Sequence, residues 1–315
     1  MQQIEEPELN QINMGSATGK NHTAISTRIR RWFSFRTLPV QQPTPPVQEP
    51  GLLWPKNSYL VLQGPKLIYC PIAKNASSTL KRLFVRLSDL REKESFLESG
   101  KVHASLQRNR TGLSLKDYPE DEAERMIRSR DYFRIVVLRN PYERLVSGYL
   151  HKFVLFPNNN PTCPPHRMIR EAIDWVYERN DRSVDYRRSI TFRHFVDYLV
   201  RNDDEHIDAH WKPQVNYLSD VSFDYYGCVE QIDDLQRVLR ERLGNDVMLE
   251  CSNVFPNAAG LVTSVPCSDL LPGELVVLGA LPNSAQLIDS SLRPAVRQRY
   301  KDDFDLYERL FGQVP

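Results

Sequence analysis

A lysine and three hydroxyl side chains lie close together in the first third of the chain. Lys74 is followed by Asn75, Ser77, Ser78 and Thr79. An ammonium group, hydroxyl groups and the free backbone N–H groups of a helix start all suit a phosphate or sulfate group, because each offers the anion a donor or a positive charge. The segment therefore predicts an anion site. Simple helix capping by the serines is the alternative interpretation.

Arg139 marks a second cationic position. It comes directly after a β-branched, strand-like run, and Pro141 then suits the first turn of a helix. Arginine grips phosphate through a planar fork of N–H groups, and Ser147 lies off the apolar stripe of its own helix. Arg139 and Ser147 are thus predicted to bind a second anionic group. An arginine in a structural ion pair is the alternative.

Two strand-to-helix units position these side chains. Residues 67–70 and 133–138 are apolar, strand-like runs, and apolar residues then recur at helical spacing over 80–87 and 142–153. Strands that alternate with helices predict a parallel sheet covered on both faces. Ligands of such sheets bind beyond the carboxyl ends of the strands, which is where both cationic positions fall.

Composition limits the function classes. The chain has 315 residues, of which 41% are hydrophobic and 26% charged, and 41 basic against 40 acidic side chains give a net charge of +1. This balance argues against a nucleic-acid partner. Five scattered cysteines without a Cys-x-x-Cys pair indicate no metal site. Cys70 and Cys228 lie in apolar runs and are expected to be buried free thiols, which favours a reducing compartment.

The chain is expected to divide into a disordered, proline-rich tail over residues 1–50 and one domain over 51–315. The run Arg28–Arg36 is cationic and aromatic. Contact with an anionic membrane surface and a solvated basic tail are its two interpretations, and the second is favoured. The sequence holds no apolar run of transmembrane length and no N-terminal signal peptide.

The spacing of apolar residues and the positions of glycine and proline predict further elements. A short helix is expected over 121–130, and a strand over 223–229. The expected longer helices are 191–201, 232–243 with Gly244 at its end, and 291–311 as one helix. Residues 155–190 are expected to be rich in loops, and residues 251–290 irregular.

Three segments resemble those of a known family. Residues 73–82, Ala-Lys-Asn-Ala-Ser-Ser-Thr-Leu-Lys-Arg, resemble the 5′-phosphosulfate loop of the Golgi-type carbohydrate sulfotransferases. Residues 138–149, Leu-Arg-Asn-Pro-Tyr-Glu-Arg-Leu-Val-Ser-Gly-Tyr, resemble their 3′-phosphate motif. His-Trp-Lys-Pro-Gln at 210–214 is similar to a further family segment. The resemblance extends from about residue 60 to the end of the chain, and the 138–149 motif is its most specific part.

The resemblance implies an α/β fold, a P-loop-NTPase-like three-layer sandwich with a central parallel sheet flanked by helices. It also implies transfer of a sulfuryl group from 3′-phosphoadenosine 5′-phosphosulfate to a hydroxyl of a carbohydrate or polysaccharide acceptor, without a metal. Lys74 would neutralise charge on the leaving phosphate, while Arg139 and Ser147 would bind the 3′-phosphate. The donor-binding loop would consist of Ala73, Lys74, Asn75, Ala76, Ser77, Ser78 and Thr79.

Two features depart from the family pattern. The family usually has proline where this chain has Ala73, and animal Golgi members carry a membrane anchor that the sequence does not show. A cytoplasmic location is therefore expected rather than the Golgi lumen.

The acceptor hydroxyl needs a base, and histidine suits this role near neutral pH. His103 is the first candidate because it lies between the two phosphate motifs, where related heparan-type sulfotransferases place a catalytic histidine. His210, in the His-Trp-x-Pro-Gln segment, is the second. The alternatives are a surface loop histidine at 103 and a packing histidine beside Trp211 at 210.

Two other functions compete with sulfuryl transfer. A nucleotide-dependent kinase also needs a phosphate loop, but the chain lacks the Gly-x-x-x-x-Gly-Lys-Ser/Thr pattern and an obvious magnesium-binding set. A non-catalytic protein that binds a nucleotide or a glycan on the same fold is the other alternative.

Overall fold

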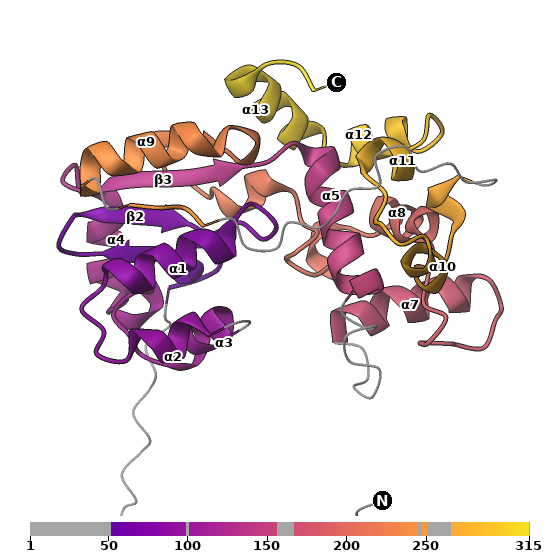
Figure 1. The fold of residues 1–315 in the computed structure, drawn as a ribbon, viewed down its shortest axis with the longest axis horizontal. Helices are drawn as coiled ribbons and strands as arrows, with labels where there is room; N and C mark the ends of the chain where they lie inside the picture. Colours follow the sequence, from indigo (N-terminus) through magenta and orange to yellow (C-terminus); the bar gives the residue numbers. More distant parts are fainter. Residues whose placement is uncertain (1–51, 99–100, 156–166, 245–246, 251–265, 315) are drawn as a thin grey trace, which may run out of the picture. The chain divides into compact units, whose positions relative to one another are not determined.

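In a computed structural model of the chain, four strands form one sheet in the order β1-β2-β3-β4 (Figure 1). The strands are β1 (Leu60–Leu62), β2 (Leu67–Cys70), β3 (Phe133–Leu138) and β4 (Tyr225–Cys228). β2, β3 and β4 are parallel, with Ile135 opposite both Tyr69 and Tyr225. β1 is antiparallel to β2, which corrects the expectation of a purely parallel sheet. The connection between them is a short turn, and a parallel crossover needs a much longer one.

The structure describes residues 52–98, 101–155, 167–244, 247–250 and 266–314, which belong to one structural unit over 48–315. The expected tail 1–50, with its cationic run Arg28–Arg36, lies outside the described residues.

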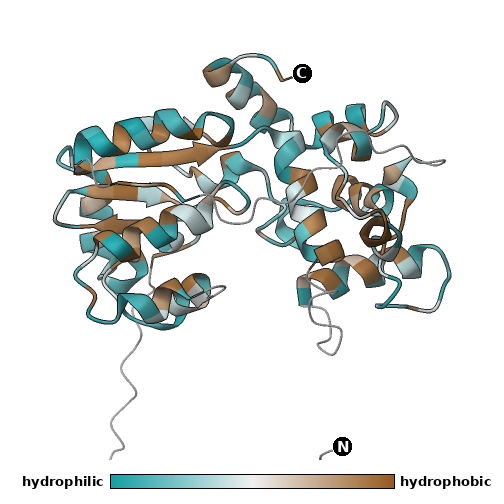
Figure 2. Ribbon diagram, in the orientation of Figure 1, coloured by the Kyte–Doolittle hydropathy of each residue, from teal (hydrophilic) through white to brown (hydrophobic). Residues whose placement is uncertain are grey.

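Helices cover both faces of the sheet. Leu67, Tyr69, Ile135 and Val137 pack against helices on one face, namely α1 (Ser77–Leu87), α2 (Lys93–Leu97), α3 (Lys101–Arg108) and α9 (Ile232–Leu243). The alternate side chains of the same strands pack on the other face against α4 (Glu120–Arg128), the 3-10 turn η5 (Gln214–Tyr217) and α13 (Lys301–Phe311). Figure 2 shows the largely hydrophobic strands, with helices on both sides of the sheet. The expected three-layer α/β fold is confirmed.

A helical region follows β3 in sequence and surrounds a second core. Its elements are α5 (Pro141–Tyr149), the π-helical turn η3 (Leu150–Leu155), α7 (Arg167–Arg179), α8 (Phe192–Arg201), α10 (Pro272–Val277), α11 (Ser284–Leu287) and α12 (Arg293–Arg299). Aromatic rings fill its centre: Phe195 lies 5.0 Å from Phe153 and 5.1 Å from Trp211 between ring centroids.

Short 3-10 turns complete the described elements. They are η1 (Lys56–Ser58), η2 (Leu115–Asp117), η4 (Asp204–His206), η6 (Val229–Gln231) and η7 (Cys267–Asp269). The helix expected over 232–243 is confirmed as α9, and Gly244 follows it with a φ of 104° that favours glycine. Cys70 and Cys228 are buried free thiols, as expected.

Two expectations about the helices are wrong. The irregular segment 251–290 contains α10 and α11, whereas the loop-rich segment 155–190 contains one helix, α7, and is non-helical over 180–190. The single helix expected over 291–311 is two helices separated at Tyr300, which is buried and donates its hydroxyl to the Trp211 carbonyl at 2.7 Å. That contact requires a change of direction that a continuous helix would not give.

No helix in the described part of the chain is long and apolar enough to cross a bilayer. The same residues contain no group of three or more His, Cys, Asp or Glu side chains arranged to hold a metal ion.

Candidate active site

The loop between β2 and α1 contains two residues with a left-handed backbone. Lys74 and Ala76 adopt left-handed conformations with φ of 71° and 55°, which is uncommon for residues other than glycine. Left-handed residues that alternate with right-handed ones direct successive N–H groups into a concavity that binds anions. Backbone strain of this kind concentrates at functional sites.

The helix that follows this loop has no side-chain cap. The N-cap of α1 is Ala76, and no side chain there accepts a hydrogen bond from the first turn. The alternative that the serines cap α1 is therefore wrong, because they lie inside the helix. The first-turn N–H groups remain suited to an anionic ligand.

The hydroxyl groups predicted for the loop face different partners. Thr79 donates to the Glu250 carbonyl at 3.2 Å, and Ser78 is 2.8 Å from the Nε2 atom of His103. Ser77 is buried at the first position of α1. Lys74, Ala76 and the backbone of α1 are thus the parts of the loop that the structure directs toward a common anion.

Gln214 joins the two predicted anion sites. This buried side chain accepts a hydrogen bond from the Arg139 backbone N–H at 3.0 Å and donates to the Arg139 carbonyl at 2.9 Å. Its Oε1 atom also accepts from the Asn75 amide, which in turn donates to Val137 at 2.9 Å. Asn75 and Gln214 therefore fasten the loop after β2 to the end of β3, and the Asn75 side chain is part of this fastening.

Asp303 holds Gln214 in place from the opposite side. Its carboxylate accepts hydrogen bonds from the backbone N–H groups of Gln214 at 2.8 Å and Val215 at 2.9 Å. Burial raises the pKa of Asp303 to about 6, although Arg144 and the two N–H groups favour its charged form. The position of Gln214 thus depends on a carboxylate that lies almost ninety residues further along the chain.

We predict that Gln214→Leu destabilises the fold by about 2–4 kcal/mol. Leucine would leave the buried N–H and carbonyl groups of Arg139 and the Asn75 amide without their partner, and each such group costs about 1–3 kcal/mol. Denaturant unfolding monitored by circular dichroism measures the change. Gln236→Leu on α9, which removes one half-buried acceptor from Leu249, is the control and should cost less. Equal stability of Gln214→Leu and the wild type would contradict the role of Gln214 in joining the two loops.

Arg139 contacts the loop after β2 directly, and part of its hydrogen-bonding capacity is not used. Its Nη1 atom donates to the Lys74 carbonyl at 3.2 Å. Its buried Nε atom makes no hydrogen bond but lies 3.9 Å from the Glu230 carboxylate, and its Nη2 atom lies 3.9 Å from the Glu143 carboxylate, so the ion pairs of the alternative interpretation are present. Burial lowers the pKa of Arg139. An incompletely paired, buried guanidinium at the end of a parallel strand is suited to a phosphate.

Arg144 is a structural brace. It is 4% exposed, and it donates to the Ala73 carbonyl and to the His210 carbonyl, each at 3.2 Å. It therefore fastens α5 to the loop after β2 and to the segment before Trp211. Ser147 is half-buried on the same helix, and its role toward a 3′-phosphate stays a prediction.

Lys74 belongs to a cluster of cations. Burial, followed by the charges of Arg139, Lys152 and Arg144, lowers its pKa to about 7. Burial also lowers the pKa of Lys81 to about 8. Cations that depress one another's pKa values attract an anion strongly, since its charge relieves their mutual repulsion.

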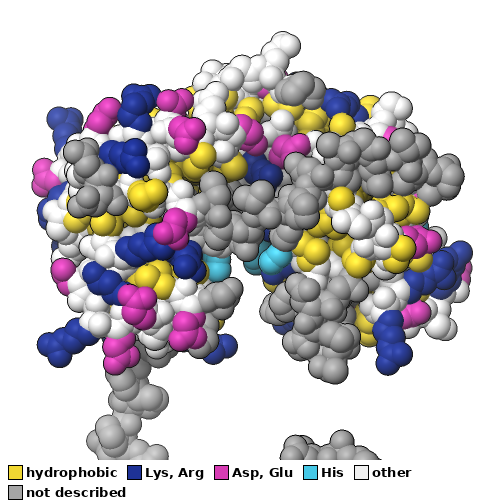
Figure 3. Space-filling view, in the orientation of Figure 1, with side chains coloured by type: hydrophobic (Ala, Val, Ile, Leu, Met, Phe, Trp, Pro, Cys, Tyr) yellow, Lys and Arg dark blue, Asp and Glu magenta, His cyan; other side chains and the backbone are white. Residues whose placement is uncertain are grey.

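The π-helical turn η3 adds two residues that sequence reasoning missed. Lys152 lowers the pKa values of Lys74, His103 and His210 by its charge, and burial lowers the pKa of His151 to about 4. Figure 3 shows histidine side chains on both sides of a hollow in this face. The available signal was the position of the His-Lys pair directly after the 138–149 motif, since π-helical turns often occur at functional sites.

The two candidate bases have different surroundings. His103 is exposed on α3, in a helix rather than the loop considered above, with its Nδ1 atom 3.0 Å from Lys81 and its Nε2 atom 2.8 Å from Ser78. His210 is half-buried, with its Nδ1 atom 2.6 Å from Asp208. Desolvation of the ring is the main cause of a lowered pKa for both histidines, even though part of the His103 side chain reaches solvent.

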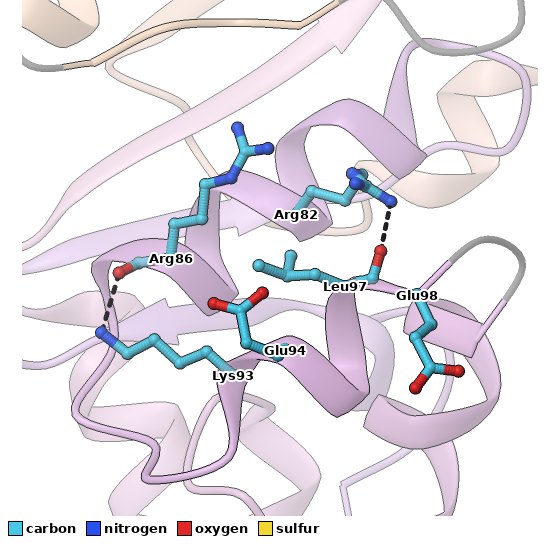
Figure 4. Close-up of a pocket in the computed structure, with 6 residues that line it drawn as sticks. All are labelled: Arg82, Arg86, Lys93, Glu94, Leu97 and Glu98. Carbon is cyan, nitrogen blue, oxygen red and sulfur yellow. Dashed lines mark hydrogen bonds between the residues drawn. The ribbon is translucent and has the colours of Figure 1, made fainter.

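A separate cavity of about 600 Å³ lies between α1 and α2 (Figure 4). Its cations already have partners: Arg82 donates to the Leu97 carbonyl at 2.7 Å, Lys93 to the Arg86 carbonyl at 2.9 Å, and Arg86 pairs with Glu250 at 2.6 Å. None of the residues predicted from the sequence lines this cavity. The residues predicted to bind an anion lie instead in the loops after β2 and β3.

Comparison with known proteins agrees with this geometry. A family model described as "Sulfotransferase family" matches residues 57–309. Carbohydrate sulfotransferase 14 of Danio rerio is 26% identical over 201 residues, which cover 63% of this chain and 51% of that protein. Carbohydrate sulfotransferase 9 of Homo sapiens is 25% identical over 201 residues, which cover 61% of this chain and 41% of that protein. The chain thus spans about half the length of these relatives, or less.

One solved structure was also compared. The crystal structure of a sulfotransferase from Alicyclobacillus acidocaldarius aligns with 81% of this chain and 98% of that chain, at 16% identity and a TM-score of 0.28.

Proposed function

Because the chain belongs to the sulfotransferase family, we propose that it transfers a sulfuryl group from 3′-phosphoadenosine 5′-phosphosulfate to a hydroxyl of a carbohydrate. One observation carries this proposal. The two predicted anion sites, the loop after β2 and Arg139 after β3, are in direct contact through the hydrogen bond from Arg139 to the Lys74 carbonyl. A donor with a 5′-phosphosulfate at one end and a 3′-phosphate at the other matches two such sites.

The residues present fit the two ends of this donor. The uncapped start of α1, the left-handed loop and Lys74 suit the phosphosulfate. The guanidinium of Arg139, whose ion pairs with Glu143 and Glu230 are long at 3.9 Å, suits the 3′-phosphate, and Ser147 lies on α5, the helix that follows it. Nothing in this pairing calls for a metal ligand from the chain.

The reaction assigns a task to each group. The acceptor oxygen attacks sulfur, the bond between sulfur and the bridging oxygen breaks, and its electron pair remains on the 5′-phosphate. Lys74 stabilises the charge that develops there. A histidine receives the hydroxyl proton, which is a contribution of about 10²- to 10⁴-fold to the rate. The products are a sulfate ester and adenosine 3′,5′-bisphosphate.

A carbohydrate acceptor is supported by the names of the two relatives, both carbohydrate sulfotransferases. The test incubates the full chain with the phosphosulfate donor, EDTA and a panel of unsulfated polysaccharides, and follows the release of adenosine 3′,5′-bisphosphate. Acceptor-dependent release supports the proposal. Turnover that requires ATP and magnesium would instead indicate a kinase, and donor binding without release would indicate a binding protein. The cytoplasmic location and the division at residue 50 stay predictions.

We predict that donor binding takes up a proton at pH 8. The pKa of Lys74 is about 7 in the free protein, and a bound anion raises it, because opposite charge favours the protonated form. Below pH 7 both states hold the proton. Above pH 7 only the complex keeps it, so affinity falls as pH rises and uptake approaches one proton per donor. Calorimetry of adenosine 3′,5′-bisphosphate binding in buffers of different ionisation enthalpy measures this uptake.

The control for this experiment is Lys74→Met, in which most of the uptake should disappear. The part that remains reports on Lys81, whose pKa of about 8 also lies in this range. An affinity that stays constant between pH 6 and pH 9 would contradict the prediction.

A further inference from the structure

We propose that Asp208 is a positioning residue that makes His210 the base of the transfer reaction, and that His103 positions Ser78 and Lys81 instead. This inference rests on the proposed function. It follows from the hydrogen bonds of the two histidine rings, which leave a free acceptor nitrogen on one ring and none on the other.

Asp208 fixes the tautomer of His210. Its Oδ1 atom lies 2.6 Å from the His210 Nδ1 atom and accepts the His210 backbone N–H at 2.8 Å. A carboxylate only accepts hydrogen bonds, so the Nδ1 atom of the neutral ring carries the proton and the Nε2 atom carries the lone pair. Nε2 is then the atom that receives the proton of the acceptor hydroxyl. This is the arrangement by which an aspartate orients a catalytic histidine.

The ring of His103 has the opposite arrangement. Lys81 lies 3.0 Å from its Nδ1 atom, and a charged ammonium group only donates. The Nδ1 lone pair is therefore engaged by Lys81, and the Nε2–H group donates to the Ser78 hydroxyl at 2.8 Å. A neutral imidazole has one lone pair, so this ring cannot accept a further proton without releasing Lys81.

The backbone of His210 is fixed to the phosphosulfate loop. Arg144 holds the His210 carbonyl and the Ala73 carbonyl with one guanidinium group. The next residue, Trp211, is 1% exposed, and its carbonyl accepts from Tyr300 at 2.7 Å. Residues on both sides of the ring are therefore immobilised, and the ring stands in a fixed relation to Lys74, as a base must.

The charges near His210 come from four parts of the chain. Asp208 favours the charged imidazolium, while the loop and the π-helical turn oppose it. The charged and titratable groups in electrostatic contact with the ring are Asp208, Lys74, Lys152, His103 and His151. Asp208 is the acid of this set, so its removal should lower the pKa of His210 further.

The first test reads the tautomers directly. Long-range ¹H–¹⁵N spectra of the full chain, labelled in its histidines, distinguish Nδ1–H from Nε2–H rings, and His210→Ala and His103→Ala assign the two signals. We expect the Nδ1–H form for His210 and the Nε2–H form for His103. In Asp208→Asn the His210 titration should move to lower pH. An Nε2–H form of His210, or a titration unchanged in Asp208→Asn, would overturn the proposal.

The second test reads the reaction. In Asp208→Asn we expect kcat to fall by about tenfold or more, but by less than the roughly 10²- to 10⁴-fold loss expected when a whole base is removed, and the acid limb of the kcat profile to move to lower pH. The KM for the donor should change little. Glu205→Gln, which removes an exposed carboxylate from the same segment, is the matched control and should leave the limb in place.

The two tests separate the proposals. If the limb moves in His103→Ala and not in Asp208→Asn, His103 is the base and the assignment to His210 is wrong. If KM and kcat change together and the limb stays, Asp208 is only structural and the assignment is also wrong. If the wild type shows no turnover on any polysaccharide, the proposed function fails, while the spectra still decide the tautomers.

Discussion

Replacing Lys74 with methionine should lower kcat by about 10²- to 10³-fold, the usual effect of removing one donor to a developing oxyanion. In the proposed reaction the charge on the leaving phosphate grows as the sulfur–oxygen bond breaks, and Lys74 is the lysine of the loop that we propose binds this end of the donor. The partly depressed pKa of about 7 adds to the effect, because the ammonium group gains more from a nearby anion when burial and neighbouring cations oppose its charge.

The control for Lys74→Met is Lys66→Met. Lys66 also has a left-handed backbone, with φ of 54°, but lies before β2, with its ammonium group 5.0 Å from the Tyr132 ring centroid. This variant also replaces a lysine that has a left-handed backbone with methionine, so it controls for the loss of one positive charge and for the change of side chain. Turnover rates measured at saturating donor should fall only in the Lys74 variant. Equal rates in the two variants would remove Lys74 from the mechanism.

Arg139→Ala should weaken the binding of adenosine 3′,5′-bisphosphate by about 10²-fold, since hydrogen bonds to charged groups contribute about 1.5–3 kcal/mol. The ion pairs of this guanidinium with Glu143 and Glu230 are long, at 3.9 Å, and a phosphate bound at hydrogen-bond distance would interact with it more strongly. Removal of Arg139 also takes one cation from beside Lys74. The pKa of Lys74 should therefore rise, and the proton uptake at pH 8 should become smaller.

Calorimetry measures the affinity, and Arg128→Ala provides the control. Arg128 is an arginine with a side chain that is 73% exposed and pairs with Glu124 on α4. Its removal should leave the affinity unchanged. Thermal unfolding of Arg139→Ala in the absence of ligand checks that the fold persists. An unchanged affinity in a folded Arg139→Ala protein would show that the 3′-phosphate binds elsewhere.

The local parts of the site could be predicted from sequence. An apolar run followed by a cation and a helical pattern locates the carboxyl end of a strand. This pattern alone predicts that Lys74 and Arg139 lie in one region. The same logic predicted α9 with both of its ends. Such predictions succeed because the signals lie within a few residues of the feature that they describe.

The parts that join the site could not be predicted in this way. Gln214 and Asp303 act through hydrogen bonds that span 75 and 89 residues, and nothing in their immediate neighbours indicates those partners. The pairing of His103 with Lys81 and of His210 with Asp208 depends on the packing of α3 against α1 and on the turn before Trp211. Sequence named both histidines, but only the packed structure assigns their nitrogen atoms.

The contact between Arg139 and the Lys74 carbonyl, reinforced by Gln214, has a consequence for the pace of the enzyme. Sulfuryl transfer leaves the nucleotide with a phosphate at each end, so both anion sites stay filled after the chemistry is complete. The groups that recruit the donor therefore also retain the spent nucleotide. If the chain carries out the proposed transfer, we therefore expect release of the spent nucleotide to limit the turnover rate, and free adenosine 3′,5′-bisphosphate to inhibit the reaction.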